Sequence, residues 1–309
     1  MNLSQLVKRF SDEESARAYL EHLRWPNGPV CPRCGADKPY KLTSRPTAKK
    51  PVRSGVYKCR GCRKPFSVTV GTIMERSHIP LSTWLLGFHL MSSSKKGFSA
   101  HQMHREFGLD YKSAWFMAHR IREAMKRPPL SGKLKGIVEA DEVYIGGRPR
   151  AYEKGKVGRP GPTSKKTPVV SLVERSGDVR SFHMERVTAD TVRPLLREHI
   201  EQSARLMTDD YNPYRGMGRE FASHESVNHS ANEYVRGEAH TQTVEGYFSL
   251  LKRGINGTFH HVSRKHLGRY LHEFDFRYNG RKVSDGERTE RAIRGAEGRR
   301  LMYRAPIDS

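Results

Sequence analysis

The sequence predicts an α/β protein of several domains, and three observations support this prediction. Two Cys-x-x-Cys pairs lie near the N-terminus, helical periodicity dominates residues 80–126, and short β-rich segments alternate with helices from residue 137 onward. The chain has 309 residues, which is enough for two or more domains. We expect an N-terminal helix over residues 1–28, a cysteine ribbon over 29–75, a helical region over 76–127, a mixed α/β domain over 128–281 and a basic tail over 282–309.

The charge of the chain indicates the kind of partner it binds. It carries 56 Lys and Arg residues against 33 Asp and Glu residues, a net charge of +23 that is spread over the whole length. Such a field favours a polyanion, and nucleic acid is the first candidate. The sequence has no run of 18 apolar residues, no lipidation signal and no signal-peptide core, so we expect a cytoplasmic protein without a membrane partner.

The four cysteines have the spacing of a metal site. Cys31 and Cys34 form one pair, and Cys59 and Cys62 form the second pair after 24 intervening residues. Two such knuckles present four thiolates, which complete a tetrahedral Zn²⁺ site with no open position. The sequence therefore predicts a structural zinc ribbon. Four free cysteines are the alternative, and a redox dithiol is disfavoured because two pairs occur without a βαβ pattern around them.

The region after the ribbon has the pattern of a helix-turn-helix-like fold. Ser99 with Gln102 forms a capping-box pattern, Gly108 fits the end of the first helix, and Asp110 fits the N-cap of a longer second helix. Two helices joined by a Gly-containing turn predict a DNA-binding element. We expect its DNA contacts on the second helix, at Lys112, Arg120 and Arg122. The alternative is a helical hairpin that links two domains and exposes a solvated basic face.

Three acidic residues of the mixed domain lie where they can meet. Residues 137–141 predict a strand that ends in Asp141, and residues 205–209 predict another that ends in Asp209. Residues 240–254 predict a helix whose buried stripe is Val244, Tyr247, Phe248 and Leu251. Glu245 flanks this stripe, and Lys252 lies seven residues later on the same side.

Carboxylates at the ends of neighbouring strands and on a helix packed across them can share one point. Like charges raise each other's pKa, and a divalent cation relieves this repulsion. Hard oxygen ligands select Mg²⁺ or Mn²⁺, and such ions activate a water or a hydroxyl for attack on a phosphodiester. We therefore predict that Asp141, Asp209 and Glu245 are catalytic metal ligands, and that the adjacent Asp210 and Glu142 are not principal ligands. The alternative for any single Asp is a turn or cap residue, and for Lys252 alone it is a solvated cation.

The sequence resembles insertion-sequence transposases of the DDE type, specifically the bacterial subgroup with an N-terminal zinc ribbon and an ISXO-like transposase domain. The segments that carry the resemblance are CPRCG, CRGCRKPFSVTVGT, VEADEVYIGGR, LMTDDY and HTQTVEGYFSLLKRGINGTFHHVSRKHLGRYLHEFDFRYNGR. The resemblance implies an RNase H-like catalytic domain over residues 128–281, in which Asp141, Asp209 and Glu245 fall on the metal-binding acids. Lys252 then falls on the basic position that contacts DNA near the cleaved phosphate, and we expect its neighbour Arg253 to bind DNA as well. Two positions depart from the pattern, with Gln242 where Asn is frequent and Phe248 where Trp is frequent.

The resemblance also implies a function. Such a protein binds the terminal inverted repeats of its element in double-stranded DNA, cleaves the ends and joins the 3′-hydroxyls to target DNA, with catalytic Mg²⁺ or Mn²⁺ and structural Zn²⁺. Because two ends are paired, we expect at least a dimer on DNA, associated with the bacterial nucleoid. Three alternatives are a non-catalytic zinc-ribbon regulator, an RNase H-like nuclease without strand transfer, and a basic RNA-binding protein, although the last does not explain the acids.

Three further features stay open at the level of sequence. The basic loop 148–168 is either a solvated insertion or a DNA contact. The arginine-rich tail from Arg281 is either a helix that touches phosphate or a disordered segment. His240 is a candidate for a supporting role beside Glu245.

Overall fold

The computed structural model describes residues 3–44, 51–128, 132–146, 166–228, 231 and 233–302. The chain divides into two compact units, a first unit of residues 1–126 with 282–309 and a second unit of residues 127–281. The segment expected as a basic tail therefore belongs to the first unit. No helix in the described part of the chain combines the length and apolar character that a membrane span requires.

The first unit is mainly helical, and several of its helix boundaries follow from capping residues. Asp12 accepts hydrogen bonds from the amides of Glu14 and Ser15, so the N-terminal helix expected over residues 1–28 is divided into two. The helices of this unit are α1 (Leu3–Arg9), α2 (Glu13–Arg24), α3 (Leu81–Ser93), α4 (Ala100–Phe107), α5 (Tyr111–Ala124) and α9 (Asp285–Arg294).

Helices α4 and α5 confirm the helical pair predicted from the caps. The Ser99 hydroxyl accepts from the Gln102 amide at 3.1 Å, and the Asp110 carboxylate accepts from the amides of Lys112 and Ser113. Gly108 adopts a φ of 64° after α4, a left-handed conformation that glycine adopts without strain. The turn between the two helices is thus encoded by three local signals.

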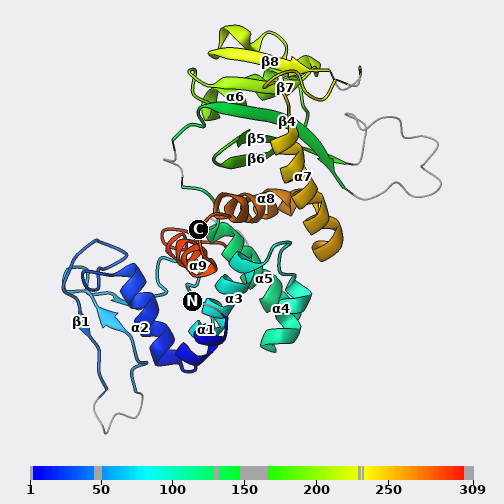
Figure 1. Cartoon of the computed structure of the whole chain (residues 1–309). Helices are drawn as coiled ribbons and strands as arrows, with labels where there is room; N and C mark the ends of the chain where they lie inside the picture. The colour runs from blue at the N-terminus through cyan, green and yellow to red at the C-terminus, as the bar shows by residue number, and fades with distance from the viewer. Residues whose placement is uncertain are drawn as a thin grey trace. The chain divides into compact units, whose positions relative to one another are not determined.

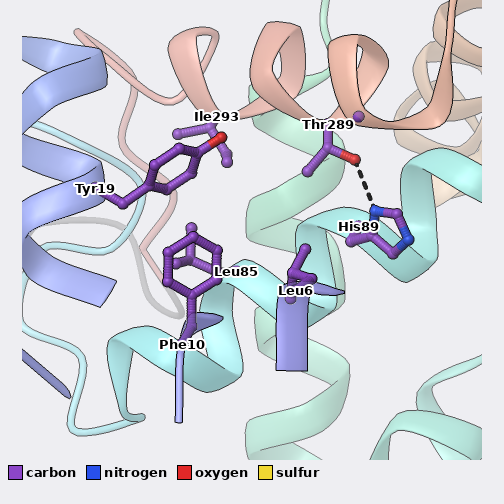
Figure 2. Close-up of a pocket in the computed structure, with 8 residues that line it drawn as sticks. Leu6, Phe10, Tyr19, Leu85, His89, Thr289 and Ile293 are labelled. Carbon is purple, nitrogen blue, oxygen red and sulfur yellow. Dashed lines mark hydrogen bonds between the residues drawn. The ribbon is translucent and has the colours of Figure 1, made fainter. Parts of the chain in front are cut away.

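Helix α9 is part of the core of the first unit. It packs against α3, where His89 Nδ1 and Thr289 Oγ1 lie 3.1 Å apart in a hydrogen bond (Figure 2). The apolar side chains drawn with this contact come from α1, the turn after it, α3 and α9: Leu6, Phe10, Leu85 and Ile293. The guanidinium groups of Arg294 and Arg299 donate to backbone carbonyls within the unit, so the basic composition of this segment partly serves the fold.

The ribbon contains a small antiparallel sheet in the order β1-β2-β3. Its strands are β1 (Tyr40–Lys41), β2 (Tyr57–Lys58) and β3 (Pro65–Phe66). The rings of Trp25, Tyr57 and Phe66 pack together with centroid separations of 5.8–5.9 Å. This aromatic cluster joins the ribbon to the end of α2, because Trp25 directly follows that helix.

The second unit contains a five-stranded mixed sheet in the order β6-β5-β4-β7-β8 (Figure 1). Strands β4, β7 and β8 run parallel, whereas β5 is antiparallel to both β4 and β6. The strands are β4 (Ile137–Ile145), β5 (Thr167–Glu174), β6 (Val179–His183), β7 (Arg205–Asp209) and β8 (Ser223–Val227). This order agrees with the RNase H-like fold that the resemblance implies.

Helices cover both faces of this sheet. Alternate residues of β4 point to opposite faces, so Val138 and Ala140 pack toward α6, whereas Val143 and Ile145 pack toward α7 and α8. The predicted stripe of the 240–254 helix is confirmed, since all four of its side chains are buried. The helical elements are α6 (Ala189–His199), η2 (Asn212–Tyr214), η3 (Met217–Arg219), α7 (Gln242–Gly254), the π-helical turn η5 (Ile255–Phe259) and α8 (Arg264–Asn279).

One strand differs from the prediction in a way that matters for the site. Strand β4 does not end at Asp141 but continues to Ile145, because β5 pairs with its whole second half. Asp141 therefore lies in the middle of a strand, opposite Ser171 of β5. Asp209 ends β7, as predicted.

Candidate active site

The four cysteines of the ribbon come together as the sequence predicts. Their sulfur atoms all lie within 4.8 Å of one another, with 3.7 Å between Cys31 and Cys62 and 3.5 Å between Cys34 and Cys59. These separations exclude disulfide bonds, whose sulfurs lie about 2 Å apart. They are close to the edge of a tetrahedron with Zn–S arms of about 2.3 Å, roughly 3.8 Å. The donor set therefore fits a structural Zn²⁺ ion.

A second cluster of metal-binding groups lies in the sheet of the second unit. Carboxylate oxygens of Asp141, Glu142 and Asp209 all lie within 4.8 Å of one another. The parallel ladder between β4 and β7 ends with Ala140 opposite Thr208, so Asp141 and Asp209 follow side by side. The two predicted strand acids are thus brought together by strand register.

The electrostatics of this cluster favour a bound cation. Burial raises the pKa of Asp141 well above its usual range, and the negative charges of Glu142, Asp209 and Glu245 raise it further. Burial, followed by the charge of Asp209, raises the pKa of Glu142 to about 7. Carboxylates that repel one another in a partly buried position are stabilised when a divalent cation shares them. Their hard oxygen donors fit Mg²⁺ or Mn²⁺.

Glu142 belongs to this cluster, although the sequence predicts that it is not a principal ligand. Its side chain leaves β4 on the face opposite to that of Asp141, because successive residues of a strand point to opposite faces. The Tyr214 hydroxyl donates to its Oε2 at 3.1 Å from the α6 side of the sheet. Asp210, the other neighbouring acid, instead forms a salt bridge with Arg215 at 3.3 Å. The expectation for Asp210 fits this geometry, and Glu142 is a candidate ligand that it missed.

Glu245 approaches the cluster from α7. Its charge contributes to the raised pKa of Asp141, but among the described residues it is not within the 4.8 Å group of oxygens. The Thr241 hydroxyl donates to Glu245 Oε1 at 3.1 Å and so restrains the side chain. The carboxylate remains exposed to solvent, one helical turn into α7.

Sequence reasoning missed a buried carboxylate close to these acids. Glu139 is fully buried and accepts hydrogen bonds from the amides of Thr243 and Val244. His240, which was considered as support for Glu245, lies with Nδ1 3.3 Å from Glu139 instead. The available signal was the spacing of Glu139 and Asp141, because residues two apart on a strand face the same side.

The five predicted DNA contacts have different surroundings. Lys112 is exposed in the first turn of α5, and Lys252 and Arg253 are exposed in the last turn of α7. Arg120 is half-buried and donates to the Glu75 carbonyl at 3.2 Å. Arg122 is buried, with 1% of its surface exposed, because it lies on the packed face of α5. This burial argues against the prediction that Arg122 contacts DNA.

The choice between a solvated insertion and a DNA contact for the basic loop 148–168 stays open. Most of the basic loop 148–168 falls in residues 147–165, which are outside the described residues, and β5 begins at Thr167.

Comparisons with known proteins agree with these two sites. Residues 11–65 match the transposase zinc-ribbon domain, and residues 133–279 match the ISXO2-like transposase domain, so the two matches cover about two thirds of the chain. The chain is also 28% identical over 282 residues to a protein of Halobacterium salinarum described as an uncharacterized protein in transposable element ISH50. That alignment covers 88% of this chain and 92% of the relative.

The zinc-ribbon match contains all four clustered cysteines, and the second match contains the whole acidic cluster together with α7. The chain therefore belongs to the transposases that combine an N-terminal zinc ribbon with an ISXO2-like transposase domain of the DDE type.

Proposed function

We propose that this transposase binds the terminal inverted repeats of its element, cleaves the DNA at the element ends and joins the free 3′ ends to target DNA. The observation that carries the proposal is the convergence of Asp141, Glu142 and Asp209 in a domain that matches a DDE transposase family. Cleavage and joining both need only a site that activates an oxygen nucleophile against a phosphodiester.

In the proposal, Asp141, Asp209 and Glu245 hold the divalent cations, and Glu142 assists them. When bound, Mg²⁺ or Mn²⁺ lowers the pKa of a nucleophilic water or hydroxyl and stabilises the oxygen that leaves phosphorus. Burial makes the negative charge on Asp141 unfavourable, and the cations would neutralise that charge.

Both proposed steps balance without an added energy source. In cleavage, a water oxygen forms a bond to phosphorus, the bond to the 3′-oxygen breaks, and that oxygen takes a proton. In joining, the 3′-hydroxyl loses its proton, attacks a target phosphodiester and displaces another 3′-oxygen. One phosphodiester bond forms for each one that breaks in the second step.

Basic residues would hold the DNA at this site. Lys252 and Arg253 are exposed at the end of α7, about two turns after Glu245, and are candidates for the strand that is cut. Lys112 is the exposed candidate on the helical pair α4–α5. A cationic side chain that contacts a phosphate makes DNA affinity depend on salt concentration. Substitution of such a residue should reduce that dependence, whereas substitution of a structural cation should not. Pairing of two ends would require at least a dimer.

Joining tests the proposal against a simple nuclease. Purified protein and Mn²⁺ are incubated with a labelled duplex of the element end that is already cut, together with a target plasmid. The proposal predicts covalently joined products with a 3′-hydroxyl donor and none with a 3′-dideoxy donor. Cleavage of uncut ends without joined products would support a nuclease of the same fold, and binding without either reaction would support a DNA-binding regulator.

A further inference from the structure

We infer that Glu139 is a positioning residue that fixes the N-terminus of α7 to β4 and thereby sets where Glu245 lies relative to Asp141. The inference deepens the proposed function, since it concerns the same acidic site. Glu139 and Asp141 are two residues apart on β4, so both side chains leave the strand on the α7 face. Strand β4 thus carries the candidate metal ligand Asp141 and also Glu139, which holds the helix that carries Glu245.

Glu139 caps α7 from outside the helix. Its Oε2 accepts from the amides of Thr243 at 2.7 Å and Val244 at 3.0 Å, and its Oε1 accepts from the Thr243 hydroxyl at 2.8 Å. These are the second and third residues of α7, whose amides have no partner within the helix. A carboxylate at this position also interacts favourably with the positive end of the helix dipole.

The residue that would ordinarily cap α7 has another role. Thr241 is at the N-cap, but its side chain makes no capping hydrogen bond and donates to Glu245 Oε1 at 3.1 Å. Because Glu139 satisfies the helix amides, the Thr241 hydroxyl is available to restrain the catalytic candidate Glu245. Glu139 therefore caps the helix, and Thr241 orients the carboxylate of Glu245.

The charge of Glu139 is compensated at the same place. Arg175 Nε lies 2.7 Å from Glu139 Oε1, and an NH₂ group of Arg175 donates to the carbonyls of Glu238 and His240. The arginine therefore ties the segment before α7 to the same carboxylate. A buried carboxylate of this kind is stable only while its partners remain, so a change at Glu139 should move the start of α7.

The test compares Glu139→Gln with Glu273→Gln. Glu273 is also fully buried and pairs with Arg277, but this pair lies within α8 and away from the α7 N-terminus. Glutamine keeps the size of the side chain but loses its charge and one of its acceptor oxygens. Both variants lose a buried ion pair, and only Glu139→Gln weakens the hydrogen bonds between β4 and the N-terminus of α7.

Four readouts separate positioning from general destabilisation. For Glu139→Gln we expect faster amide hydrogen exchange in residues 242–246, and Mn²⁺ affinity and single-turnover cleavage that are each lower by about 10–100-fold. DNA affinity should stay within about twofold, and Glu273→Gln should change Mn²⁺ affinity by less than about twofold. Equal Mn²⁺ affinity and cleavage in the two folded variants would overturn the inference.

A second variant keeps the test decisive if Glu139→Gln does not fold. Thr243→Val preserves the shape of the side chain and both helix amides, but it removes the hydroxyl that donates to Glu139 Oε1. We expect faster exchange of the Thr243 and Val244 amides and weaker Mn²⁺ binding than in the wild type, and wild-type values of both would overturn the inference. If the wild-type protein binds Mn²⁺ but cuts no DNA, the proposed function fails, while exchange and Mn²⁺ affinity still decide the role of Glu139.

Discussion

The hydroxyl of Tyr214 donates a hydrogen bond to Glu142 at 3.1 Å, and this contact reaches the acidic cluster from the α6 face of the sheet. Asp141 comes from the α7 face, so the cluster is supported from both sides. Tyr214 is fully buried, and the adjacent carboxylates contribute to a pKa well above the usual range of a tyrosine, after the main effect of burial. The hydroxyl is therefore a neutral donor that holds Glu142 in place.

Tyr214→Phe should weaken the metal site without unfolding the protein. Removal of one outer partner of a metal-binding carboxylate typically lowers metal affinity by about 10-fold or more, and loss of one hydrogen bond costs about 1 kcal/mol of stability. Mn²⁺ titration followed by the electron paramagnetic resonance of the free ion measures the first effect, and urea unfolding measures the second. The control is Tyr234→Phe, at an exposed tyrosine. Wild-type Mn²⁺ affinity in Tyr214→Phe would mean that Glu142 takes no part in binding.

Zinc removal should unfold the ribbon. The sulfurs of Cys31 and Cys59 are buried at its centre, and the sheet around them has only two residues per strand, too few to be stable alone. We expect one Zn²⁺ per chain by elemental analysis in the wild type and markedly less in Cys59→Ser. Chelation should change Trp25 fluorescence and expose residues 28–70 to protease, and added Zn²⁺ but not Mg²⁺ should reverse both changes. An intact ribbon after complete zinc removal would contradict the assignment.

Two basic residues of α5 should respond differently to substitution. Lys112 is exposed, so Lys112→Gln should weaken DNA binding and reduce the slope of log K against log salt by about 0.9. Arg122 is buried, so Arg122→Met should change thermal stability and leave that slope unchanged. Binding measured from 50 to 200 mM salt, beside thermal melts, separates the two. A reduced slope for Arg122→Met with unchanged stability would show that Arg122 contacts DNA after all.

The stability of the second unit should depend on pH through Asp275. This carboxyl accepts hydrogen bonds from the Tyr247 hydroxyl at 2.6 Å and from the Ser181 amide at 2.8 Å, yet burial raises its pKa to about 6. The folded state thus favours the protonated form. Its contribution to stability is full below the ordinary value of 3.8 and is lost as pH rises through about 6.

Asp275→Asn should remove this dependence. In the wild type this group lowers the unfolding free energy by on the order of 3 kcal/mol between pH 4 and 6.5, and Asp275→Asn should abolish that decrease, which urea titrations at several pH values can measure. The exposed Asp190 provides the control, since Asp190→Asn should leave the slope near that of the wild type. An unchanged slope in Asp275→Asn would place the pKa of Asp275 near its ordinary value in the folded state.

Local signals explain which features the sequence could predict. The cysteine spacing, the caps Ser99 and Asp110 and the buried stripe of α7 depend on neighbouring residues, and the structure contains all of them. The end of β7 at Asp209 also follows from a short apolar run. These signals were sufficient to predict that Asp141 and Asp209 lie in the same region of the sheet.

Features that depend on distant residues were missed. The extension of β4 beyond Asp141 is caused by pairing with β5, which follows a long insertion in the sequence. The role of Glu139 depends on amides more than 100 residues later, and the burial of Arg122 depends on helices that pack around α5. Single-sequence periodicity does not record such contacts.

The neighbours Asp209 and Asp210 offer the most direct test of the proposed metal-dependent cleavage. Asp209 lies in the acidic cluster, whereas Asp210 pairs with Arg215, so the two substitutions to Asn remove the same charge from adjacent positions. The measurement is cleavage of a plasmid that carries the element ends, with purified protein and Mg²⁺. We predict cuts at the element ends with the wild type and Asp210→Asn, and a loss of at least about 100-fold with folded, zinc-loaded Asp209→Asn. Equal cleavage by the two variants would contradict the assignment of this cluster as the active site.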